Sequence, residues 1–152
     1  MIQRKQSLYL LAVLILSVLL FTGPLAFITT EPGGIYLLHN GAVDMEGNKL
    51  DMATWPLTVM ISIASLLSLY ALLSYKRRPR QMRLCIFLML FDAGMIGLIS
   101  YYIWYIMNQY QGIQHVFQWR IVLPAVMLIL LYLAFKGVQR DELLIQSYER
   151  IR

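Results

Sequence analysis

Four long apolar runs dominate the sequence and restrict what the chain can fold into. They cover residues 7–28, 55–75, 84–107 and 119–135. Each approaches the ~20 residues that a helix needs to cross the ~30 Å hydrocarbon core of a bilayer. Because lipid offers no partner for backbone N–H and C=O groups, a crossing segment must be helical. The sequence therefore predicts an all-α membrane protein, with one domain of four transmembrane helices over residues 1–152.

The composition also favours a bilayer over water as the solvent of this chain. Hydrophobic residues make up 59% of the 152 residues and charged residues only 14%, whereas about a quarter of the residues in a soluble domain are charged. A net charge of +5 is compatible with nucleic-acid binding only where basic side chains cover a soluble surface. Here the basic residues flank the apolar runs, so we expect no nucleic-acid partner.

The positions of the basic residues predict the orientation of the bundle. All but two of the 13 Lys and Arg residues lie before the first run, between the second and third runs, or after the fourth. Because positively charged loops stay in the cytoplasm, both termini, the loop 76–83 and the tail 136–152 are expected on that side. The two exceptions, Lys49 and Arg120, fall on the outer side.

The first apolar run, with its basic start, also fits a secretory signal peptide. A small-x-small cleavage site does not follow, because Phe21 and Pro24 stand two positions before Gly23 and Ala26. An uncleaved membrane anchor is therefore the favoured interpretation.

The loop between the second and third runs carries the densest positive charge. It consists of Lys76, Arg77, Arg78, Arg80 and Arg83. A short loop held between two spans is expected to set the topology and to contact anionic lipid headgroups. A dedicated ligand or protein site is the alternative.

Residues 29–54 form the only sizeable loop expected on the outer side. A β-prone run, Ile35–Leu38, lies between a Gly pair and the turn signal Asn40-Gly41. We predict a small periplasmic hairpin that lies on the membrane surface, as a cap rather than as a binding loop.

Aromatic residues gather near the outer ends of the runs and around the second, short outer loop. They are Trp55, Tyr101, Tyr102, Trp104, Tyr105, Tyr110 and Trp119. Trp and Tyr collect where a membrane meets water, so an interfacial belt is the favoured interpretation. A stacking site for a sugar or a quinone is the alternative.

The tail after the fourth run is expected to continue as a cytoplasmic helix. One face of that helix carries the apolar stripe Leu144, Tyr148 and Ile151. The opposite face carries Glu142, Gln146 and Glu149. The apolar stripe is suited to the inner leaflet or to a partner protein.

Asp92 is an acidic residue inside an apolar run. It lies eight residues from Leu84, or about 12 Å below the cytoplasmic edge at the rise of an α-helix. A charge at that depth costs a few kcal/mol or more, and Ser65 and Ser68 of the second run lie at matching depth. We therefore predict an intramembrane polar site in which Asp92 hydrogen-bonds these serines. Contact with a ligand or partner, or movement of a proton, are the alternatives.

Small residues near Asp92 predict a close contact between the second and third helices. They are Ala93, Gly97 and Ser100, and small side chains let two membrane helices approach each other. The predicted role of this stripe is helix packing.

The sequence carries no motif that indicates enzymatic chemistry. His39 and His115 are far apart and Cys85 is the single cysteine, so we expect neither a metal site nor a cofactor, and no catalytic residues. The expected function is that of a non-enzymatic accessory or scaffold component of a cell-envelope complex. Its partners would be membrane lipids and a membrane protein or a second copy of the chain. A small-molecule carrier, or a lipid- or quinone-binding protein, is the alternative.

Several stretches resemble one known family over the full length of the chain. They are "MIQRKQSLYLL", "TWPL", "YKRRPRQMRLC", "LP" at 123–124 and "AFKGVQRDELLIQSYERIR". The family comprises small four-span inner-membrane proteins of Bacteroidota and is catalogued as a domain of unknown function. The resemblance implies a four-helix protein of the bacterial inner membrane, without catalytic residues to carry over.

Overall fold

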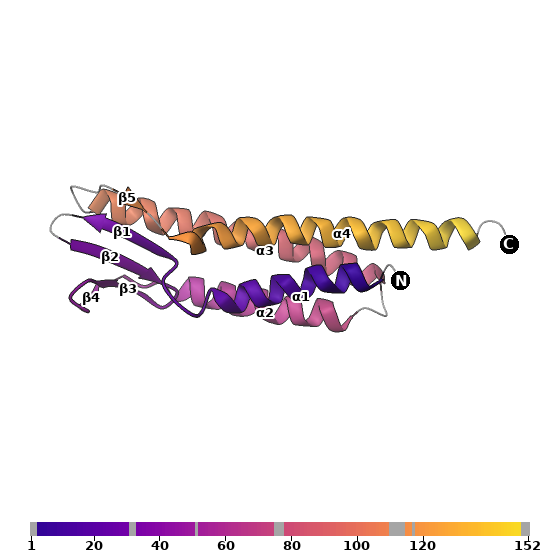
Figure 1. Cartoon of the computed structure of the whole chain (residues 1–152), viewed down its shortest axis with the longest axis horizontal. Coiled ribbons are helices and arrows are strands. Elements are labelled where there is room, and N and C mark those ends of the chain that lie inside the picture. Colours follow the sequence, from indigo (N-terminus) through magenta and orange to yellow (C-terminus); the bar gives the residue numbers. More distant parts are fainter. Residues whose placement is uncertain are drawn as a thin grey trace.

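Long helices and one small sheet make up the part of the chain that the structure describes, and they lie end to end (Figure 1). The computed structural model describes residues 3–30, 33–50, 52–74, 78–109, 115–116 and 118–149, with the backbone alone for 3–6, 30, 78, 115–116 and 142–149. The helices are α1 (Gln3–Leu19), α2 (Trp55–Leu73), α3 (Arg78–Gln109) and α4 (Val122–Glu149), with the 3₁₀ turn η1 (Trp119–Ile121) before α4. The strands are β1 (Ala26–Thr30), β2 (Gly33–Leu38), β3 (Gly41–Asp44), β4 (Lys49–Leu50) and β5 (His115–Val116).

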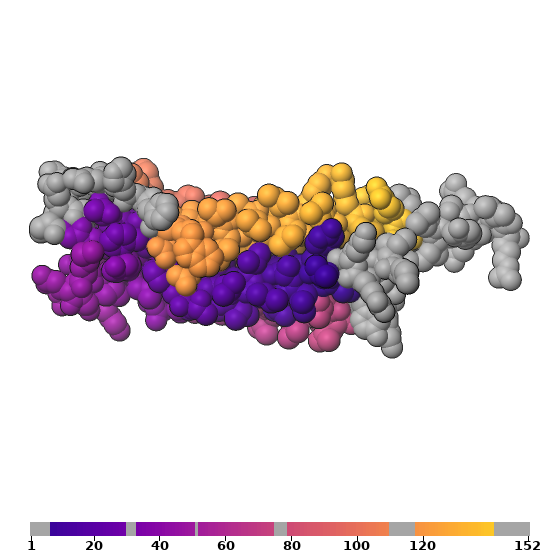
Figure 2. All heavy atoms as spheres, viewed as in Figure 1, coloured from indigo at the N-terminus to yellow at the C-terminus, as the bar shows by residue number. Residues whose placement is uncertain are grey.

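The helices form an antiparallel bundle in which each helix packs against two others. Helices α1 and α3 each contact both α2 and α4, and the chain reverses direction from one helix to the next (Figure 1). Helices α1 and α4 lie side by side along one face of the molecule (Figure 2). The start of α1 and the end of α4 therefore lie at one end of the bundle, and the sheet lies at the other.

A repeat of three and four positions defines the buried stripe of each helix. In α2 the buried residues are Leu57, Ile61, Ala64, Ser68 and Ala71. In α3 they are Gln81, Cys85, Leu88, Asp92, Met95, Ile99, Tyr102 and Ile106. Alternating steps of three and four average 3.5 residues, which is the spacing of helices packed at small crossing angles.

Three helical segments are long and apolar enough to cross a membrane. They are Trp55–Leu73, Pro79–Gln109 and Trp119–Asp141. Their outward faces are apolar as well, since Leu66 and Leu90 are 66% and 72% exposed. Helices with apolar outward faces are suited to a lipid environment, so these three segments fit a membrane protein.

Helix α1 ends earlier than the sequence predicts, and the prediction of a first span over 7–28 is wrong at its outer end. Its apolar part, Ser7–Leu19, is shorter than the other three. The Thr22 hydroxyl donates a 2.7 Å hydrogen bond to the Leu19 carbonyl and closes the last turn. Pro24 follows, and because the ring of proline disfavours helix in the residue before it, the chain turns. Residues 26–30 form strand β1 instead.

The sheet is larger than the predicted hairpin in residues 29–54. Its order is β4-β3-β2-β1-β5, and every pair is antiparallel. Strand β5 comes from the loop between α3 and α4, which the sequence indicated only as short and polar. A turn does connect β2 with β3 near the predicted place, but it consists of His39 and Asn40, because Gly41 already belongs to β3 and pairs with Leu38. One face of the sheet is buried, with Ala26 opposite Leu37 and Ile28 opposite Ile35 in register.

One more element boundary differs from the sequence-based expectation, and another agrees with it. The predicted loop 76–83 is largely helical, because α3 begins at Arg78, and Pro79 is tolerated in a first turn where N–H groups have no partner within the helix. Helix α4 continues without a break to Glu149, as predicted for the tail. The side chains of the predicted stripe Leu144, Tyr148 and Ile151 lie outside the described residues.

Side-chain hydrogen bonds hold the sheet on the bundle. At the start of α2, the Thr58 hydroxyl donates to the His39 carbonyl at 2.7 Å, and the hydroxyl of Thr54 donates to the Leu38 carbonyl at 3.2 Å. Leu38 is the last residue of β2 and His39 follows it. The two bonds therefore fix the end of the strand to the first turn of the helix.

Candidate functional site

Asp92 lies on the buried stripe of α3, between the apolar side chains of Leu88 and Met95. Its side chain is 2% exposed, and neither of its carboxylate oxygens has a hydrogen-bond partner among the described residues. A charged carboxylate in an apolar interior costs far more than a neutral one. The neutral, protonated form is therefore the form that this position favours.

The predicted hydrogen bonds from Ser65 and Ser68 to Asp92 are absent, and that prediction is wrong. The Ser68 hydroxyl donates to the Ala64 carbonyl at 2.7 Å. The Ser65 hydroxyl lies 3.0 Å from the carbonyl oxygen of Ile61 and 2.9 Å from that of Ser62. Serine in a helix readily bonds the carbonyl of the preceding turn, and these bonds use the protons that Asp92 would have accepted.

The predicted packing stripe of Ala93, Gly97 and Ser100 is wrong as well. All three residues are exposed in the chain, and a Cβ added to Gly97 would meet no atom within 4 Å. Contact with α2 instead involves Gly94, where an added Cβ would lie 3.4 Å from Cε of Met60. The predicted stripe is thus rotated away from the neighbouring helix, toward the outside of the bundle.

The chemistry open to Asp92 is limited by its surroundings. No group of three or more His, Cys, Asp or Glu side chains that could hold a metal ion occurs among the described residues. A single carboxyl on an apolar stripe can hold a proton or accept a hydrogen bond from a ligand. The other buried acid of the described chain, Asp141, belongs to the last part of α4, at the end of the bundle away from the sheet.

The basic cluster lies at the end of the bundle opposite the sheet, where α3 begins. Arg80 and Arg83 are exposed there. Arg78 is described by its backbone alone, and Lys76 and Arg77 lie outside the described residues. At the same end of α4, the Lys136 ammonium lies 4.9 Å from the ring centroid of Tyr132.

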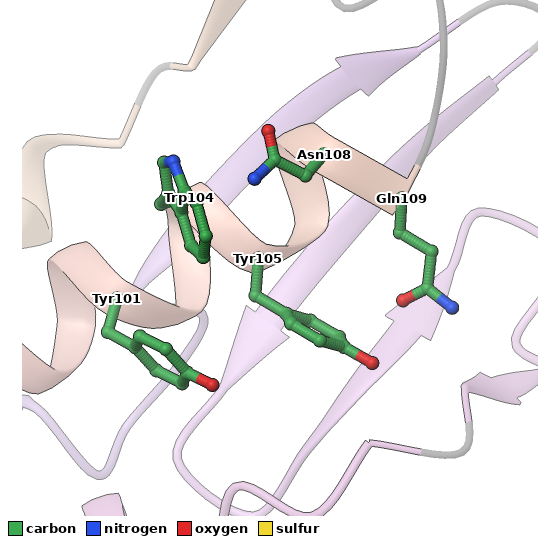
Figure 3. A pocket seen from close by; sticks show the side chains of 5 residues that line it. All are labelled: Tyr101, Trp104, Tyr105, Asn108 and Gln109. Carbon is green, nitrogen blue, oxygen red and sulfur yellow. The ribbon is translucent and has the colours of Figure 1, made fainter.

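The aromatic residues of α3 surround a shallow hollow near the sheet. The hollow measures about 490 Å³ and is lined by Tyr101, Trp104, Tyr105, Asn108 and Gln109. Figure 3 shows two rows of side chains on the helix, with Tyr101, Tyr105 and Gln109 in one and Trp104 and Asn108 in the other. This arrangement fits an interfacial belt, because the rings are exposed.

One member of the predicted aromatic belt stands apart from these rings. Tyr102 faces the interior, where its hydroxyl donates a 3.0 Å hydrogen bond to the Ala53 carbonyl. Tyr110 lies outside the described residues. The belt therefore excludes Tyr102, which the three-and-four spacing of α3 places on the buried stripe.

Sequence reasoning missed a contact between Arg120 of η1 and Gly23. A Cβ added to Gly23 would lie only 2.6–2.9 Å from the guanidinium atoms of Arg120, so the guanidinium rests directly on the glycine backbone. The Arg120 guanidinium carbon also lies 5.0 Å from the ring centroid of Trp119. The available signal was the position of Arg120, one of the two basic residues that the sequence places away from the other eleven.

A comparison with known families agrees with the resemblance found in the sequence. The family described as "Domain of unknown function (DUF4293)" matches residues 2–151. No curated protein and no solved structure matches the chain. Because the family match covers nearly the whole length, the chain belongs to this family of unknown function.

Proposed function

We propose that the protein is a non-enzymatic scaffold or accessory component of a complex in the bacterial inner membrane. All four helices cross the bilayer in this proposal, α1 included. The sheet lies in the periplasm and the two ends of the chain lie in the cytoplasm. The exposed Arg80 and Arg83 support this orientation, because basic residues at helix ends stay on the cytoplasmic side.

Aromatic residues at two levels support the membrane placement. Trp55 and Tyr70, near the two ends of α2, are both exposed and are separated by about 22 Å at the rise of an α-helix. Exposed Trp119 and Tyr132 bracket the apolar part of α4 in the same way. Trp and Tyr mark both interfaces of a membrane, and an exposed ring near each end of both helices fits this pattern.

The observation that carries the scaffold role is that folded structure projects from both ends of the bundle. At one end lies the five-stranded sheet. At the other end α4 runs to Glu149, past the apolar segment that ends at Asp141, and extends beyond the other helices (Figure 1). Projections of this kind are suited to docking other proteins on either side of the membrane.

Affinity purification in mild detergent followed by mass spectrometry tests this role. We expect a partner protein in stoichiometric amount, lost when the predicted apolar stripe is changed by Leu144→Ser with Tyr148→Ser. The matched control is Gln146→Ser with Glu149→Ser on the opposite predicted face, which keeps the partner. Purification of the chain with no other protein in stoichiometric amount would contradict the scaffold role.

A second candidate function is supported by Asp92. Its carboxyl group is buried without a partner, which favours a carrier or a lipid- or quinone-binding protein whose ligand supplies the missing hydrogen bond. Extraction of the purified protein with organic solvent and mass spectrometry of the extract tests this. A quinone or another small molecule that is retained by the wild type and lost from Asp92→Asn supports it, and an extract without such a compound argues against it.

A further inference from the structure

Arg120 is a partly buried cation at the junction between α4 and the sheet. Its Nε atom is buried and has no hydrogen-bond partner. Asp44 and Glu46 are the described acidic residues between α1 and α2. Both accept hydrogen bonds from groups other than Arg120. Asp44 accepts a hydrogen bond from the Met45 N–H at 2.7 Å, and Glu46 accepts one from Asn48 at 3.4 Å. Within the described part of the chain, Arg120 therefore lacks an anionic partner.

Such a group is costly unless an anion completes it. A buried donor without an acceptor destabilises the fold, and the loss is larger when the group is charged. A basic residue at the outer end of a span also opposes the charge bias that orients the bundle. The planar guanidinium fork matches the oxygens of a phosphate and binds them bidentately. Arg120 thus has the chemistry of a phosphate-binding group at the level of the outer membrane interface.

An apolar path leads away from Arg120 along the outside of α4. Beside the guanidinium lies the exposed ring of Trp119. Exposed apolar side chains then follow at steps of three and four: Val122, Val126, Ile129 and Leu133. From Val122 to Leu133 the helix rises about 17 Å, close to half of the ~30 Å hydrocarbon core. A lipid whose phosphate binds Arg120 would therefore place an acyl chain along the part of α4 that lies in one leaflet.

We propose that Arg120, seated on Gly23, binds the phosphate of one anionic phospholipid in the outer leaflet, with an acyl chain on the Val122–Leu133 stripe. This inference rests on the proposed membrane placement but not on the scaffold role. A lipid suits the position better than a protein carboxylate, because the guanidinium lies against Trp119 and this exposed ring leads onto an exposed apolar stripe with the length of one leaflet.

Native mass spectrometry of the purified chain tests the proposal, with phosphatidylglycerol and uncharged diacylglycerol of equal chain length as probes. The wild type should retain one phosphatidylglycerol at least tenfold more strongly than diacylglycerol. Arg120→Gln should abolish this preference. The matched control Lys49→Gln removes the other basic residue of the outer side and should leave it unchanged.

Gly23→Ala keeps the positive charge of Arg120 but displaces the guanidinium, because the new Cβ would lie only 2.6–2.9 Å from its atoms. We expect an intermediate loss of preference, and this variant decides the question if Arg120→Gln does not fold. Equal retention of the two lipids by the wild type, or an unchanged preference in the Arg120 and Gly23 variants, would overturn the proposal.

Two further arms distinguish the source of the anion. Inorganic phosphate at millimolar concentration should not displace the lipid, and displacement would assign Arg120 to a soluble anion instead. Loss of a co-purifying protein in Arg120→Gln, with lipid retention unchanged, would assign Arg120 to a protein carboxylate and also overturn the proposal. A chain that retains the lipid but has no protein partner would contradict the scaffold role alone.

Discussion

The hydroxyl of Tyr102 in α3 donates a 3.0 Å hydrogen bond to the carbonyl of Ala53, 49 residues earlier in the chain. Ala53 lies between strand β4 and helix α2, so this bond fastens the exit of the sheet to the interior of the bundle. Together with Thr54 and Thr58, it connects three segments that are distant in sequence.

Tyr102→Phe is therefore expected to destabilise the fold. The substitution keeps the ring but leaves the Ala53 carbonyl without its donor, and a lost hydrogen bond of this kind costs about 1 kcal/mol. The measurement is the midpoint of thermal unfolding in mild detergent. Tyr101→Phe is the matched control, since Tyr101 is 53% exposed and should tolerate the change. Equal midpoints for the two variants would show that the Tyr102 bond contributes nothing.

Gly97→Ala is expected to stabilise the protein by about 0.5–1 kcal/mol, because glycine inside a helix is less favourable than alanine and the added Cβ meets open space. The contrasting variant is Gly34→Ala, whose Cβ would lie 2.6 Å from ring atoms of Phe27 and should destabilise the sheet. Unfolding midpoints of both variants check this. A loss of stability in Gly97→Ala would indicate that Gly97 does pack against a neighbouring helix, as the sequence predicted.

Asp92→Asn is expected to leave folding and abundance unchanged. The amide has the same shape as the protonated carboxyl and is likewise neutral, which suits a position where the described surroundings balance no charge. Asp92→Arg is the contrasting variant, because it forces a large cation into the same stripe and should lower abundance strongly. The measurement is the amount of protein in isolated membranes. A sharp fall for Asp92→Asn would mean that the ionised carboxylate is paired in the native protein.

The helices and the apolar surfaces follow from the sequence because lipid leaves a crossing segment little choice of backbone structure. The end of α1 could not be predicted in the same way. Residues 20–28 are nearly all apolar, and a short apolar run fits a strand as well as a helix. Pro24 was the informative residue, because helix is disfavoured before proline. Strand β5 was missed because two residues of pairing leave no pattern in a polar loop.

Matching residues by depth gave the wrong surroundings for Asp92. Depth places Ser65 and Ser68 along the membrane normal, but it does not say which way a side chain points around the helix axis. The steps of four and three from Leu88 to Asp92 to Met95 carry that information. They place the carboxyl on the apolar stripe and turn Gly97 outward. Arg120 lies against Gly23, which belongs to the turn after α1. The sequence alone did not predict where that turn lies.

The central claim is that the sheet and the two chain ends lie on opposite sides of the membrane, with all four helices crossing it. Labelling of single cysteines with a membrane-impermeant maleimide tests this most directly, in a Cys85→Ala background. The variants are Asn40→Cys in the sheet, and Gln3→Cys, Pro79→Cys and Gln139→Cys at the opposite end of the bundle. We predict that Asn40→Cys reacts in intact cells whose outer membrane admits the reagent. The other three should react only after the inner membrane is broken. Labelling of Gln3→Cys in intact cells would contradict the crossing of α1, and labelling of Pro79→Cys or Gln139→Cys there would contradict the proposed orientation.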